Sequence, residues 1–148
     1  MSGAEASVLR RVLSWLPVVA YTGLIWWLSS QTIDIPLDRV PFRDKGVHFL
    51  EYGALALMMT YAVRVSWPDA RYGLIAAWWL TVSLGLTDEF HQAYVPGRSA
   101  DVYDLVADAC GAFAAIALYG VVSALWRRRE HAPVAIEAPR ERPSGERL

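Results

Sequence analysis

The chain has 148 residues, of which 55% are hydrophobic, and it includes seven tryptophans and seven tyrosines. This is more apolar surface than a small soluble core can bury, which argues against a soluble globular domain. The formal net charge of −1 argues against nucleic acid and other polyanions as partners.

Residues 1–11 are predicted to form a cytoplasmic N-terminus, and the charge-free run 12–30 to form the first membrane span. Its 19 residues are close to the ~20 that cross a bilayer and exceed an ordinary signal-peptide core, so we expect an uncleaved helix. Further spans are predicted at about 45–64, 72–91 and 101–126. The apolar runs are continuous rather than alternating, which indicates helices and not a membrane barrel.

The predicted fold class is therefore an all-α integral membrane four-helix bundle. Its membrane domain covers residues 12–129, and the Pro-, Glu- and Arg-rich segment 130–148 is expected to be a disordered cytoplasmic tail. The basic residues beside the spans favour a cytoplasmic location for both termini. Seven lie on that side: Arg10, Arg11, Arg64, Arg71, Arg127, Arg128 and Arg129. Four lie on the other: Arg39, Arg43, Lys45 and Arg98.

Ionisable residues cluster at the predicted outer ends of the last three spans. Residues three, four and seven apart share a helix face, and carboxylates or histidines at membrane depth indicate a functional site. The second span carries Asp44, Lys45, His48, Glu51 and Tyr52; the third carries Asp88, His91 and Gln92; the fourth carries Asp101, Asp104 and Asp108. Glu89 is expected to face solvent.

Two features of the sequence predict how these clusters meet. The acidic stripe of the fourth span continues into Gly111 and Ala115, whose small side chains allow a neighbouring helix to approach closely. Pro96 and Gly97 predict a tight turn before the fourth span, which places Arg98 above the carboxylates. We therefore expect one polar site facing the outside.

The segments Asp44-Lys45...His48-Phe49...Tyr52 and Asp88-Glu89...Gln92...Val95-Pro96-Gly97-Arg98-Ser99...Asp104...Gly111 resemble the VanZ-like family. The resemblance implies a small multi-helix membrane protein, and the founding member of that family is associated with resistance to the glycopeptide teicoplanin. His91 and Asp108 depart from the family pattern. We expect a multi-pass protein of a bacterial-type cytoplasmic membrane.

The ionisable residues fit two kinds of chemistry. His48, Asp88, Asp104 and Asp108 are candidate ligands of a divalent cation, with a charge-paired polar core as the simpler alternative. In the other interpretation, Lys45 and Arg98 bind a phosphate. His48 or His91 then acts as nucleophile or general acid, oriented by Glu51 or Asp88.

The remaining candidate substrate contacts are Tyr52, Gln92, Asp101 and Asp104. Three functions fit these residues. The first is a hydrolase or transferase acting on an anionic, phosphate-bearing envelope lipid. The second is a non-enzymatic module that binds such a lipid, a glycopeptide or an envelope-synthesis protein. The third is a lipid or proton-coupled transporter, which requires a homo-oligomer because four short helices make a poor conduit.

Overall fold

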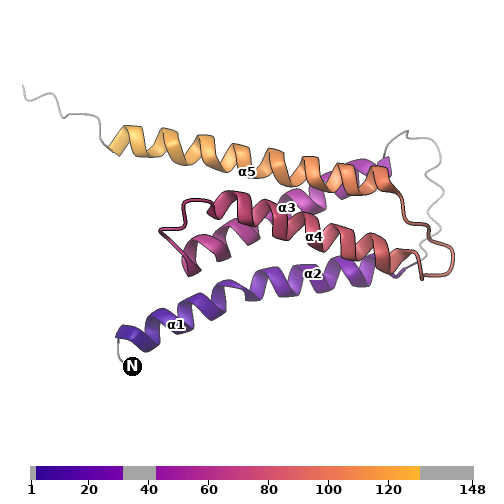
Figure 1. Ribbon diagram of the computed structural model, residues 1–148, viewed down its shortest axis with the longest axis horizontal. Coiled ribbons are helices and arrows are strands. Elements are labelled where there is room, and N and C mark those ends of the chain that lie inside the picture. The colour runs from indigo at the N-terminus through magenta and orange to yellow at the C-terminus, as the bar shows by residue number, and fades with distance from the viewer. Residues whose placement is uncertain (1–2, 32–42, 131–148) are drawn as a thin grey trace, which may run out of the picture.

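The computed structural model describes residues 3–31 and 43–130, where α-helices are its only regular secondary structure. The helices are α1 (Gly3–Ser14), α2 (Leu16–Ser29), α3 (Arg43–Ser66), α4 (Gly73–Gln92) and α5 (Val102–Glu130). Helices α1 and α2 follow one another almost end to end and act as one long helical element, so the described residues form a four-helix bundle (Figure 1). The predicted all-α four-helix bundle is confirmed. Beyond residue 130, the predicted tail lies outside the described residues.

The element formed by α1 and α2 is longer than the predicted span at 12–30, because helix begins at Gly3 and is interrupted only at Trp15. Pro17, in the first turn of α2, lacks the backbone N–H that a continuous helix would use. The Trp15 indole donates a hydrogen bond to Ser66 Oγ at 2.9 Å and meets the Trp67 ring edge-on. The junction of α1 and α2 is thereby tied to the end of α3.

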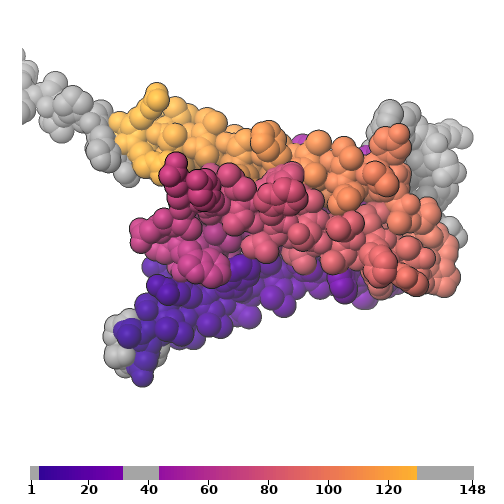
Figure 2. Space-filling model, in the orientation of Figure 1, coloured from indigo at the N-terminus to yellow at the C-terminus, as the bar shows by residue number. Residues whose placement is uncertain are grey.

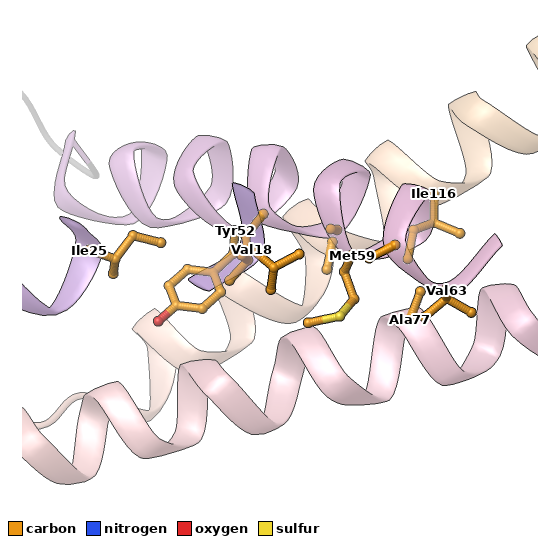
Figure 3. Packing of buried hydrophobic residues seen from close by; sticks show 11 residues of the cluster. Val18, Ile25, Tyr52, Met59, Val63, Ala77 and Ile116 are labelled. Carbon is orange, nitrogen blue, oxygen red and sulfur yellow. The ribbon is translucent and has the colours of Figure 1, made fainter. Parts of the chain in front are cut away.

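Helix α3 is the centre of the bundle and contacts all four other helices. Its buried residues Tyr52, Leu55, Ala56 and Met59 recur every three to four positions, which is the spacing of one helical face. They pack against apolar residues of the surrounding helices, including Val18 and Ile25 of α2, Ala77 of α4, and Ala112 and Ile116 of α5 (Figure 3). The core therefore depends on α3.

Helix α4 buries a stripe of small residues that ends in polar ones. Gly73, Ala77, Thr81 and Gly85 are spaced four residues apart and are all buried, and the same stripe continues to Glu89. Small side chains at this spacing let α4 approach α3 and α5 closely. The polar end of this stripe, at Glu89, lies at the charged end of the bundle.

Helices α3 and α5 cross at closest range where both carry glycine. A Cβ built on Gly111 would overlap the Phe49 carbonyl, and one built on Gly53 would lie 3.3 Å from the Gly111 carbonyl oxygen. The close approach predicted from Gly111 and Ala115 is confirmed, because Ala115 lies at the same crossing. The crossing fixes the register between the polar residues of α3 and those of α5.

Within the described residues, two helical stretches are long and apolar enough to cross a membrane, Ala4–Ser29 and Val102–Arg129. Large apolar side chains also cover the outside of the bundle, among them Trp79, Phe113, Leu118 and Val121. Figure 2 shows α5 along the length of the bundle and α1 extending past the body of the other helices. These features support a membrane protein.

Candidate functional site

Four helix ends meet at one end of the bundle (Figure 1). They are the C-terminal ends of α2 and α4 and the N-terminal ends of α3 and α5. Most of the predicted site residues lie at these four ends, and several contact one another through side chains. Their assignment as catalytic or substrate-binding groups stays a prediction.

Lys45 joins the start of α3 to the start of α5. Its Nζ donates to Asp101 Oδ2 and to Asp104 Oδ1, each at 2.7 Å. Asp101 also accepts a hydrogen bond from the Tyr103 backbone N–H, which caps α5. The nearby Lys45 ammonium lowers the pKa of the Asp101 carboxyl, since it favours the ionised form. Lys45 and Asp101 remain partly exposed and form the rim of the cluster.

His48 lies beneath this rim, paired with Asp108 of α5. Its Nδ1 is 3.0 Å from Asp108 Oδ1, and its Nε2 is 3.9 Å from Asp104 Oδ2. Because an ionised carboxylate only accepts, His48 Nδ1 donates to Asp108, which leaves Nε2 as the free nitrogen. The predicted orienting partner was Glu51 or Asp88, whereas in the structure Asp108 makes this contact with His48. In the described part of the chain Glu51 makes no hydrogen bond or ion pair.

Gly85 and Tyr52 hold the His48–Asp108 pair in place. Gly85 of α4 lies against Asp108, and a Cβ at Gly85 would stand 2.8 Å from Asp108 Oδ2. The Tyr52 ring lies parallel to the His48 ring, with centroids 6.4 Å apart. Tyr52 is only 1% exposed, so it supports His48 from within the core and does not line an open surface.

Asp88 forms a second buried polar group between α4 and α2. Its Oδ1 accepts a hydrogen bond from Ser29 Oγ at 2.7 Å, and its Oδ2 accepts one from Gln92 Nε2 at 2.9 Å. Both partners are neutral donors, and all three residues are buried. The described residues contain no ion pair between Asp88 and Arg98. Ser29 was not among the predicted site residues, because no charge on the first span pointed to it.

Glu89 was expected to face solvent, and the structure shows the opposite. Only 5% of the residue is exposed, and its Oε2 accepts a hydrogen bond from the Asp101 backbone N–H at 2.8 Å. The other carboxylate oxygen, Oε1, is buried and has no hydrogen-bond partner in the described residues. The spacing of four from Gly85 was the available signal, because it puts Glu89 on the buried stripe of α4.

In the described part of the chain, His91 and Arg98 make no hydrogen bond or ion pair with Lys45, His48 or the carboxylates that these two residues contact. His91 Nε2 is 2.9 Å from Ser30 Oγ, and its ring stacks on Trp26 of α2. Arg98 is exposed in the turn between α4 and α5, where Gly97 adopts a positive φ of 82°. It makes no side-chain hydrogen bond or ion pair with the described residues. The structure therefore separates His91 from His48 and leaves the Arg98 guanidinium free at the surface.

The residues that could share a metal ion differ from the predicted candidates. His48, Glu89 and Asp104, from α3, α4 and α5, each offer a ligand atom within 4.8 Å of the other two. Asp88 does not belong to this group, since both of its oxygens accept hydrogen bonds from Ser29 and Gln92. Asp108 stands behind His48 as its hydrogen-bond partner.

A helical bundle with long apolar helices and a buried ionisable cluster at one end supports assignment to the polytopic membrane proteins. The VanZ/LLP1 family model matches residues 5–123, and the chain belongs to this family. No curated protein and no solved structure matches the chain.

Proposed function

We propose that this VanZ-like membrane protein binds the headgroup of an anionic, phosphate-bearing envelope lipid at the charged end of its bundle. The observation that carries the proposal is the position of Lys45 and Arg98. Lys45 is at the rim of the cluster, and Arg98 is exposed in the turn beside it without a carboxylate partner among the described residues. A guanidinium offers a planar fork of donors that suits phosphate oxygens.

An apolar groove between α4 and α5 supports an amphiphilic ligand over a free phosphate. The groove has a volume of about 700 Å³ and is lined by Trp78, Trp79, Phe113 and Val121, among others. Trp78 also donates to the Ala109 carbonyl, one residue beyond Asp108, while the rest of the lining lies farther from the charged end, on the first turns of α4 and from the middle of α5 onward. An acyl chain is the occupant that a bilayer supplies to such a surface.

The test is a titration of detergent-purified protein with short-chain phosphatidic acid, with phosphatidylcholine of the same chain length as the reference lipid. Phosphatidic acid should bind more tightly, and Arg98→Gln should weaken it about 10-fold, the loss of roughly one charge-assisted hydrogen bond. Arg71→Gln, at the opposite end, is the matched control and should bind like wild type. Equal affinity for both lipids, or an Arg98→Gln variant that binds like wild type, would reject the proposal.

Hydrolysis of the bound phosphate is a second candidate, favoured by one specific contact. The Asp108–His48 pair places a carboxylate behind an imidazole and leaves Nε2 free, as an oriented general base or nucleophile requires. Release of inorganic phosphate by wild type, lost in His48→Gln with lipid affinity retained, would support turnover. Binding without phosphate release would leave the protein as a recognition module.

A further inference from the structure

Three buried side chains, one from each of α3, α4 and α5, converge on a small volume under the Lys45 rim. One ligand atom each from His48, Glu89 and Asp104 lies within 4.8 Å of the other two. Each residue is less than 10% exposed. The set brings together an imidazole nitrogen and two carboxylate oxygens, which are metal-ligand types.

Each of these side chains already uses one of its two polar atoms. His48 Nδ1 pairs with Asp108, Asp104 Oδ1 accepts from Lys45, and Glu89 Oε2 accepts from the Asp101 backbone N–H. The atoms left over are His48 Nε2, Asp104 Oδ2 and Glu89 Oε1. The hydrogen bonds thus hold each side chain and leave one polar atom of each without a short hydrogen bond in the described residues.

Glu89 Oε1 provides separate evidence for a ligand. It is buried and accepts no hydrogen bond from any described residue. Burying an unpartnered carboxylate oxygen is costly, and such atoms are rare in folded proteins. A cation between the three side chains would satisfy this oxygen.

We propose that His48, Glu89 and Asp104 bind a divalent transition-metal ion such as Zn²⁺ or Mn²⁺. The imidazole ligand favours these ions over Mg²⁺ and Ca²⁺, which prefer oxygen ligands alone. His48 Nε2 and Asp104 Oδ2 are 3.9 Å apart. Two ligands on a tetrahedral ion with bonds of ~2.1 Å lie about 3.4 Å apart. The His48–Asp104 pair would therefore close by about 0.5 Å, and a pair as wide as 4.8 Å would close by about 1.4 Å.

Asp108 would act as a positioning residue for this site. A metal-bound histidine commonly donates its other ring N–H to a carboxylate, which fixes the tautomer and the ring orientation. Asp108 Oδ1 already makes this contact with His48 Nδ1 at 3.0 Å. Gly85 lets Asp108 reach it, because a side chain at that position would occupy the same space.

The inference goes beyond lipid binding and can fail or hold independently of it. A bound cation would add positive charge among the carboxylates beneath Lys45, which would strengthen the attraction of this end of the bundle for an anionic headgroup. It would also use His48 Nε2 as a ligand, which excludes that nitrogen as a nucleophile. Metal binding therefore decides whether His48 is a metal ligand or a nucleophile.

The experiment measures binding of Zn²⁺ and of Mn²⁺ alone to the full chain. The protein is purified in detergent without a histidine tag and stripped with chelator, then studied by calorimetry and by elemental analysis after dialysis. Wild type should bind one ion per chain. Glu89→Gln and His48→Gln should each weaken binding at least about 10-fold, and Asp108→Asn about 10- to 100-fold.

Two matched controls separate the site from other groups of the same kind. Asp69→Asn removes an exposed carboxylate in the turn between α3 and α4, and His91→Gln removes the histidine that faces α2. Both should bind like wild type. Wild type without a bound ion, or wild-type affinity in Glu89→Gln and His48→Gln, would overturn the site. If Glu89→Gln does not fold, His48→Gln and Asp108→Asn decide in its place.

Discussion

Asp88 shows how a single buried carboxylate is accommodated in this bundle. It is 1% exposed and contacts no cation among residues 3–31 and 43–130, yet both of its oxygens accept hydrogen bonds from neutral side chains. Asp104 is accommodated differently, with Lys45 on one oxygen. Burying a carboxylate without partners is costly, and the donors beside each of these two residues offset that cost.

Gly85 leaves room for Asp108, so a methyl group at position 85 should disturb the hydrogen bond between Asp108 and His48. The Cβ of Gly85→Ala would stand 2.8 Å from Asp108 Oδ2. We expect a loss of about 1–3 kcal/mol in the free energy of unfolding, the usual cost of overpacking. Gly23→Ala is the control, because nothing lies within 4 Å of the Cβ it adds. Detergent-based unfolding of both variants checks this, and equal stability would contradict it.

The pair of Lys45 and Asp101 should make stability depend on pH. The pKa of Asp101 is lowered in the folded protein, so the pair stabilises the fold above the unfolded pKa of an aspartate. That contribution is lost as the pH falls through the lowered folded pKa. Thermal unfolding at descending pH should therefore show a steeper loss in wild type than in Asp101→Asn, which keeps a capping side chain. Parallel curves would contradict the prediction.

Among the elements, the pairing of α3 with α5 aligns the site. Gly111 meets the Phe49 backbone, and this crossing sets His48 opposite Asp108. Helix α4 then brings its polar end against both. The site thus depends on glycines that carry no chemistry themselves.

Gly111→Ala should separate α3 from α5, because its Cβ would overlap the Phe49 carbonyl. Backbone cannot move aside cheaply, so we expect a loss of about 3 kcal/mol or more. Gly120→Ala, on the same helix with nothing within 4 Å, should be neutral or gain up to about 1 kcal/mol from helix propensity. Circular dichroism during thermal unfolding compares the two, and the crossing would be disproved by equal melting temperatures.

The elements were easier to predict from the sequence than the contacts between them. Continuous apolar runs separated by charges predicted the four helical elements, and residue spacing put Asp104 and Asp108 on one face. Spacing along one helix says nothing about rotation relative to its neighbours. The sequence therefore predicted that Glu89 faces solvent and that Glu51 could orient His48. In the structure Glu89 is buried, and Asp108 is the residue that hydrogen-bonds to His48.

The whole molecule has a charged site at one end and basic residues at the other. Arg10, Arg11, Arg64 and Arg71 lie on helices or turns at the end opposite Lys45 and Arg98. Basic residues favour the cytoplasmic side, so we propose that the charged site faces outward and that both ends of the chain are cytoplasmic.

This orientation can be tested by labelling cysteines in intact cells with an impermeant maleimide. The exposed Cys110 must first be changed to serine so that it does not react. Ser99→Cys should then be labelled from outside, whereas Asp69→Cys should react only after the membrane is opened. The reverse pattern would show that the site faces the cytoplasm.

The central feature of the molecule is the ligand site that polar side chains of separate helices form at one end of the bundle. Anomalous diffraction from crystals grown with Mn²⁺ tests this most directly, since it locates the ion without assumptions about the protein. We predict one peak bounded by His48, Glu89 and Asp104, with Asp108 behind the histidine. A peak only elsewhere, or no peak at all, would contradict this site.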